Sequence, residues 1–265
     1  MENFEAPGSI AKTGTGSRRE GEDFENLIAK LWLEFRDTAK SSGANIEIVK
    51  TSGSRFYAKL TVGKRSVFIP TLEDNNITHY LDVENSQWLD IAFSVSGLVE
   101  KYPTEDEAIR RYAPETGPYA NKSYPSIYKG MKTKFDDTVV LLDNGILREK
   151  ILLEYKTAKS TAKHQIDGNA HERLSFQMMQ YLEVATRYTK CSLVVIANGA
   201  FVRYRNKYHV NFHIQADRLR NFSWFSMEYA CTKAAYIRFL EGLLNWLFEG
   251  KPRCKRNTND QEEHQ

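Results

Sequence analysis

The chain is poor in cysteine and has no long apolar run, and each shortage argues against a class of protein. Its three cysteines, Cys191, Cys231 and Cys254, are widely spaced and form no Cys-x-x-Cys pair. This pattern argues against a disulfide framework, a structural zinc site and an iron–sulfur cluster. No run approaches the ~20 apolar residues that span a bilayer, and the N-terminus lacks the apolar core of a signal peptide. We therefore expect a cytoplasmic protein without a membrane partner.

A strong charge of one sign is also missing. The formal net charge of the 265 residues is only +3, so any nucleic-acid surface has to be a local concentration of Lys and Arg. A phosphate-binding loop is absent as well, because no Gly-Lys-Ser/Thr follows Gly14-x-Gly16. The 41% of hydrophobic residues suffice for one large domain, or for one domain with an elaborated subdomain.

Composition sets the expected domain boundaries. Residues 1–20 contain several Gly, Ser and Thr without apolar periodicity, which is typical of a flexible N-terminal arm. Residues 251–265 form a charged tail, which we expect to be disordered. A single folded domain is therefore expected over residues 21–250.

The domain begins with an amphipathic helix. From Gly21 onward, apolar residues recur at helical spacing, namely Phe24, Leu27, Ile28, Leu31 and Phe35. Glu22, Asp23 and Glu25 lie in its first turns, where acids complement the helix dipole. The alternative interpretation is that Glu25 or Glu22 reaches a functional cleft as an extra metal or water contact.

Further apolar patterns predict a mixed α/β order. In chain order they are a strand at 45–50, a hairpin at 56–70, a helix at 87–100, a helix at 171–187, a buried strand at 192–197, a strand at 201–214 and a long helix at 224–248. This alternation favours an α/β fold with a central mixed β-sheet flanked by helices.

The hairpin at residues 134–156 carries the most informative chemistry. Asp143-Asn144-Gly145 tolerates positive φ, so the apolar runs on either side can fold back on one another. That turn brings Asp136 or Asp137 close to Glu154 and Lys156. Two converging carboxylates hold a hard divalent cation, and a neighbouring lysine can position or deprotonate water. Metal-dependent phosphodiester cleavage needs such an arrangement.

Two other segments combine aromatic and basic residues. Residues 112–134 interleave tyrosines with lysines, so they form either a DNA-facing loop or a merely solvated one. Residues 201–214 alternate basic and apolar positions, which predicts a basic strip along one strand face. The candidate DNA-binding residues are Lys122, Tyr124, Lys129, Lys132, Lys134, Lys159, Gln177, Arg203, Arg205 and Lys207.

The hairpin resembles the PD-(D/E)xK nuclease superfamily, in which an acid opens one strand and Glu or Asp, any residue and Lys close the next. Asp136 or Asp137 and the run Glu154-Tyr155-Lys156 take these positions, with Phe135 in place of the name-giving proline. The order of elements over residues 21–200 is similar too. We favour Asp137 as the first acid, because it shares a strand side with Val139 and Leu141; Asp136 remains the alternative.

This resemblance implies a restriction-endonuclease-like core with added recognition loops and a Mg²⁺ cofactor. The metal would be held by Asp137, Glu154 and the carbonyl of Tyr155, and Lys156 would orient or activate the attacking water. Asp136 and Glu25 complete the candidate catalytic set.

Two classes of this superfamily are compatible with the sequence. A type II restriction endonuclease would cleave double-stranded DNA at a specific short sequence as a homodimer. RecB-like exonucleases or repair nucleases carry Gln-x-x-x-Tyr, which Gln177 and Tyr181 match, but they usually accompany a helicase domain or an iron–sulfur cluster. We therefore favour the restriction endonuclease. A DNA-binding protein without catalytic activity is the alternative from another class.

Overall fold

A computed structural model describes residues 15–50, 56–71, 79–80, 92–94, 132–158, 170–185, 190–199, 201, 212, 214, 226–230 and 232–253. The chain divides into two compact units. The first comprises Met1–Leu89 and Asp136–Gln265, and the second comprises Asp90–Phe135. The second unit thus falls inside the range for which the sequence predicted one domain.

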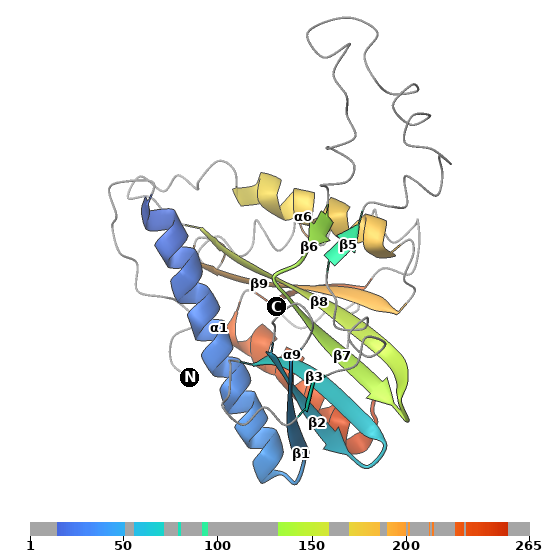
Figure 1. Ribbon diagram of the computed structural model, residues 1–265. Coiled ribbons are helices and arrows are strands. Elements are labelled where there is room, and N and C mark those ends of the chain that lie inside the picture. The colour runs from blue at the N-terminus through green and yellow to red at the C-terminus, as the bar shows by residue number, and fades with distance from the viewer. Residues whose placement is uncertain are drawn as a thin grey trace, which may run out of the picture. The chain divides into compact units, whose positions relative to one another are not determined.

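A mixed β-sheet is the centre of the first unit, as expected for an α/β fold. Its described residues form eight strands in the order β10-β9-β8-β7-β3-β2-β1-β4 (Figure 1). The strands are β1 (Asn45–Lys50), β2 (Phe56–Val62), β3 (Arg65–Thr71), β4 (His79–Tyr80), β7 (Asp137–Asp143), β8 (Ile146–Ala158), β9 (Cys191–Gly199) and β10 (Met227–Ala230). Strands β1, β2, β3, β7 and β8 are neighbours in this order, and each pair is antiparallel. Strands β8, β9 and β10 run parallel to one another.

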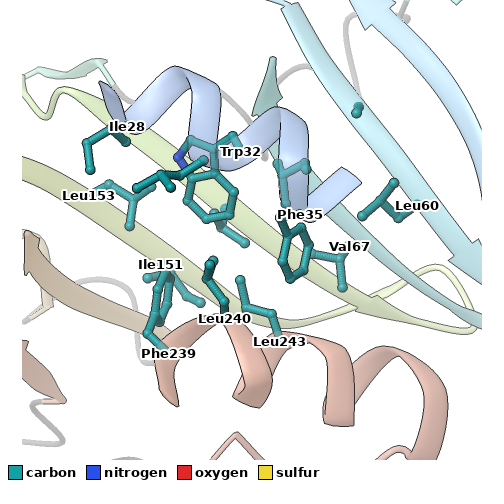
Figure 2. Close-up of a cluster of buried hydrophobic side chains, with 14 of the residues drawn as sticks. Ile28, Trp32, Phe35, Leu60, Val67, Ile151, Leu153, Phe239, Leu240 and Leu243 are labelled. Atoms are coloured by element: carbon teal, nitrogen blue, oxygen red, sulfur yellow. The ribbon is translucent and has the colours of Figure 1, made fainter. Parts of the chain in front are cut away.

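Helices α1 (Thr15–Ser41) and α9 (Lys233–Glu249) pack on one face of this sheet. Their apolar stripes meet alternate residues of the strands, because successive side chains of a strand point to opposite faces. Figure 2 shows Trp32 and Phe35 of α1 facing Leu240 and Leu243 of α9 over the sheet residues. This cluster is the main hydrophobic core of the unit.

Helix α6 (Ala170–Ala185) lies over the opposite face. Ile151 and Leu153 of β8 belong to the core beneath α1 and α9, so Glu154, the next residue, points the other way. Gln177 of α6 donates a hydrogen bond to Glu154. The order β8, α6, parallel β9 is a crossover of the kind that parallel strands require.

The second unit contains an antiparallel pair of short strands among its described residues. Strand β5 (Ala92–Ser94) pairs with β6 (Lys132–Lys134), with Ala92 opposite Lys134. The prediction of a helix over residues 87–100 is therefore wrong at Ala92–Ser94. Across the described parts of both units, no helix is both long enough and apolar enough to cross a membrane.

Several predicted elements are confirmed. The strand at 45–50 is β1, the hairpin at 56–70 is β2 and β3 joined at Gly63, the helix at 171–187 is α6, and the buried strand at 192–197 is β9. Gly63 has φ 58°, a conformation that glycine adopts at no steric cost. Local hydrophobic periodicity and turn residues therefore sufficed for these elements.

Other boundaries differ from the prediction. Helix α1 begins at Thr15, inside the expected arm. The prediction missed this start because the first turns of the helix are polar and carry no apolar periodicity. The long helix expected from residue 224 begins at Lys233, after the N-cap Thr232, and the preceding residues form β10. Within the predicted strand 201–214, the positions that the structure describes (Phe201, Phe212 and Ile214) are helical. The other positions of this predicted strand lie outside the described residues.

Removing the indole of Trp32 should cost more stability than any surface change on α1. Trp32 is 1% exposed and makes edge-to-face contacts with Phe35 and Phe239, at centroid distances of 5.8 and 6.1 Å. Trp32→Ala should lower the free energy of unfolding by about 3–5 kcal/mol, because it leaves a cavity between two helices and the sheet. Urea unfolding followed by circular dichroism measures this loss. Lys30→Ala on the exposed face is the control, and an equal loss there would contradict the prediction.

Candidate active site

The β7–β8 hairpin forms as the sequence predicts. Asn144 and Gly145 take positive φ values of 54° and 76° at the turn. The register pairs Asp137 with Leu153, and it shifts once, between Leu141 and Leu142. One step further along this register, Asp136 comes opposite Glu154, on the same side of the sheet.

Asp136 and Glu154 meet at the open end of the hairpin. Oδ2 of Asp136 accepts a hydrogen bond of 2.7 Å from the backbone N–H of Tyr155. Glu154 is only 4% exposed. Burial, and then the charge of Asp136, raise the pKa of Glu154 to about 7. The hairpin therefore concentrates two acidic groups in a place where their negative charges are poorly solvated.

Two donors fix the carboxylate of Glu154. Nζ of Lys156 donates to Oε1, and Nε2 of Gln177 donates to Oε2 at 2.9 Å. Lys156 opposes the effect of burial, since its charge lowers the pKa of Glu154. Gln177 is 6% exposed, so α6 supplies a buried amide to the site. Strand β8 and helix α6 together hold Glu154 in one orientation.

Asp137, which the sequence analysis favoured, has different partners. Its Oδ1 accepts from the backbone N–H of Thr138 at 3.0 Å and from the hydroxyl of Tyr57 at 3.4 Å. The parity argument places Asp137 with Val139 and Leu141, which face the core beneath α1 and α9. Glu154 points to the other face. A regular count from the turn would place Phe135 opposite Glu154, and the register shift between Leu141 and Leu142 brings Asp136 there instead.

Glu25 of α1 is electrostatically coupled to the same site. Burial, then the charges of Asp136 and Glu22, raise the pKa of Glu25. The helix-dipole interpretation of Glu25 is wrong, because α1 begins at Thr15 and has no acid in its first turn. The structure thus brings Glu25 into the field of Asp136.

The candidate DNA-binding residues are only partly described. Gln177 is a buried partner of Glu154 rather than an exposed reader of DNA. Lys132 and Lys134 lie two apart in β6 of the second unit. The others lie outside the described residues, namely Lys122, Tyr124, Lys129, Lys159, Arg203, Arg205 and Lys207.

Tyr181, the last residue of the Gln-x-x-x-Tyr pattern, does not join Gln177 at Glu154. Its hydroxyl donates to the carbonyl of Cys191 at 2.8 Å and accepts from the N–H of Ser226 at 3.3 Å. Tyr181 therefore ties α6 to the first residues of β9 and to the residue before β10. Burial raises the pKa of this phenol far above its usual value, in keeping with a neutral structural hydroxyl.

Arg253 is a buried charged residue that sequence reasoning placed in the disordered tail. It is 5% exposed and pairs with Glu149 and Glu228. A lone arginine after Gly-Lys-Pro gives no signal of burial, because its partners are distant in sequence. The folded part of the chain thus extends at least three residues beyond the predicted boundary.

Within the described part of the chain, no group of three or more His, Cys, Asp or Glu side chains is arranged to hold a metal ion. The predicted ligand set is different in kind, since it consists of two carboxylates and a backbone carbonyl. Comparisons with protein-family models, with curated proteins and with solved structures found no match. Function therefore has to be argued from the geometry of this site.

Proposed function

We propose that the protein is a Mg²⁺-dependent nuclease that hydrolyses phosphodiester bonds of DNA. The observation that carries this proposal is the convergence of Asp136 and Glu154 at the end of the β7–β8 hairpin, with Lys156 bonded to Glu154. Two acids can hold a divalent cation, and a lysine beside them can position the water that attacks a phosphodiester.

The oxygen atoms of this site are suitable ligands for a hard divalent cation. Asp136 contributes to the raised pKa of Glu154, so a cation between the two carboxylates would relieve their repulsion. Tyr155 directs its N–H toward Asp136, and in an extended strand the C=O of the same residue points to the same side. Asp136, Glu154 and the carbonyl of Tyr155 would therefore hold Mg²⁺. In this proposal Asp136 replaces Asp137 as the ligand.

Each residue of the site then has a separate role. Bound Mg²⁺ would stabilise the negative charge that develops on the phosphate. Lys156, on the same strand face as Glu154, would orient the attacking water and favour its deprotonation. Gln177 keeps Glu154 in its ligand orientation from the side of α6. Glu25 adds negative charge near Asp136 and would bind either a water of the metal or a second ion.

The order of elements supports the finer assignment to a restriction-endonuclease-like core. A helix, an antiparallel pair that carries the acids, a second helix and a parallel strand follow one another as α1, β7–β8, α6 and β9. We propose a type II restriction endonuclease that acts on double-stranded DNA at a specific short sequence. A palindromic site would call for a homodimer, which sedimentation of the protein with and without DNA would reveal.

Incubation with supercoiled plasmid tests this function. With Mg²⁺ the protein should produce discrete fragments, and EDTA should abolish them. Progressive digestion from ends of linear DNA would instead favour the RecB-like exonuclease. Retarded mobility without any cut, over a panel of plasmids and genomic DNA with Mg²⁺ or Mn²⁺, would contradict the nuclease and favour a DNA-binding protein.

Gln177→Leu should weaken metal binding without unfolding α6. The change removes the donor to Oε2 of Glu154, and loss of a group that orients a ligand typically costs about 10–100-fold in metal affinity. Titration with Mg²⁺ by calorimetry, together with the concentration for half-maximal cleavage, measures the effect. Gln180→Leu on the same helix is the matched control. Equal metal affinity of the two variants would contradict the positioning role of Gln177.

A further inference from the structure

The C-terminal turn of the described chain places one arginine across three parallel strands. Nη2 of Arg253 donates to Oε1 of Glu149 on β8 at 2.9 Å and to Oγ of Ser192 on β9 at 3.4 Å. Its Nη1 donates to Glu228 on β10. The hydroxyl of Ser192 also donates to Glu149, at 2.5 Å. One guanidinium therefore contacts the side chains of β8, β9 and β10.

This cluster lies on the sheet face that α1 and α9 cover. Glu149 is two residues from Ile151, Ser192 is two residues from Val194, and Glu228 is two residues from Ala230. All three apolar neighbours belong to the main core, so the polar residues point to the same face. The guanidinium stands 5.5 Å from the ring of Phe239 on α9. Arg253 is thus enclosed between α9 and the parallel strands.

The backbone after α9 is shaped to deliver Arg253 to this place. Gly250 has φ 70° and caps α9 through a hydrogen bond to the carbonyl of Trp246, which ends the helix and reverses the chain. Lys251 and Pro252 are exposed, and Arg253 is buried. A Cβ on Gly242 of α9 would come within 2.9 Å of Cγ of Arg253. Glycine at 242 therefore leaves room for the arginine to pass beneath the helix.

On the opposite face of the sheet, helix α6 contacts β9 and the start of β10. The hydroxyl of Tyr181 bonds to Cys191 and Ser226 at the beginnings of β9 and β10. Edge strand β10 is therefore fixed from α6 on one face and from Arg253 on the other. Four residue pairs, Met227 to Ala230 against Leu193 to Ile196, join β10 to β9, so few backbone contacts set its register.

Register is a particular problem for this half of the sheet. A hairpin turn fixes the register of β7 on β8 and of β2 on β3. Parallel strands need long crossovers, which leave their register to side-chain contacts. Buried ion pairs add little net stability compared with apolar residues, and their best-attested use is to specify register.

We propose that residues 250–253 form a C-terminal strap whose Arg253 sets the register of β9 and β10 on β8. The parallel half of the sheet, which supports α6 and its Gln177, then reaches its final arrangement only when the end of the chain has docked. This proposal does not depend on the nuclease function.

Hydrogen exchange of the whole protein tests the strap. In Arg253→Met, the amides of β9 and β10 should exchange about 100-fold faster or more, while the amides of the β2–β3 hairpin keep their protection. Lys251→Met, which removes an exposed ion pair with Glu249 in the same segment, is the control and should leave exchange unchanged. Unchanged exchange of β10 in Arg253→Met would overturn the proposal.

A second variant covers the case in which Arg253→Met does not fold. Glu149→Gln, Glu228→Gln and Arg253→Met together replace the charged cluster by neutral groups and leave no buried unpaired charge. We expect this variant to retain the β2–β3 hairpin and to lose protection selectively in β9 and β10. Native protection of β10, or an equal loss throughout the sheet, would overturn the role in register.

Discussion

Asp136→Asn should abolish cleavage, with a loss of about 100–1,000-fold or more in the rate constant. The substitution removes a negative charge from the proposed metal centre while it keeps the shape of the side chain. Its amide oxygen can still accept the hydrogen bond from the N–H of Tyr155, so the hairpin should fold as before. Single-turnover cleavage of plasmid at saturating protein measures the chemical step, and circular dichroism checks the fold.

Asp137→Asn is the matched control for this experiment. The change is chemically identical and one residue away, and the new amide oxygen can still accept from Thr138 and Tyr57. We expect its cleavage rate to stay within about threefold of the wild type, because the amide keeps both hydrogen bonds of Asp137 and the proposed ligand Glu154 points to the other face. An inactive Asp137→Asn beside an active Asp136→Asn would show that Asp137 holds the metal after all.

Lys156→Met should also lose cleavage, by about 100–10,000-fold, which is the usual contribution of a positioned acid or base. Methionine keeps the length of the side chain but can neither orient water nor donate to Glu154. DNA binding should persist, because phosphate contacts elsewhere provide most of the affinity for a polyanion. Cleavage assays with Mg²⁺ and fluorescence anisotropy of labelled DNA with Ca²⁺ separate the two effects.

Lys59→Met is the control for Lys156, since Lys59 makes a half-buried ion pair with Glu47 on the same sheet. Both variants lose one positive charge, so a general electrostatic effect on DNA binding would appear in each. Full activity of Lys156→Met would refute the assignment of the site. Loss of DNA binding in Lys156→Met but not in Lys59→Met would show that Lys156 acts in substrate binding rather than in the chemical step.

The favoured first acid shows where sequence reasoning reached its limit. The sequence narrowed the choice to two adjacent aspartates, and the turn at Asn144 and Gly145 predicted the hairpin that brings one of them to Glu154. Choosing between the two required knowledge of which sheet face the long core helices cover. That information comes from contacts of β7 with α1 and α9, which are far away in sequence.

The sequence by itself determined the local elements, because turn residues and hydrophobic periodicity act over a few positions. The β7–β8 hairpin, helix α6 and strand β9 belong to this group, as does the pairing of Glu154 with Lys156 on one strand face. The tertiary structure alone decided the partners of isolated polar residues. It brought Gln177 to Glu154, Asp136 into the site and Arg253 beneath α9, because burial and charge compensation join residues that the linear sequence keeps apart.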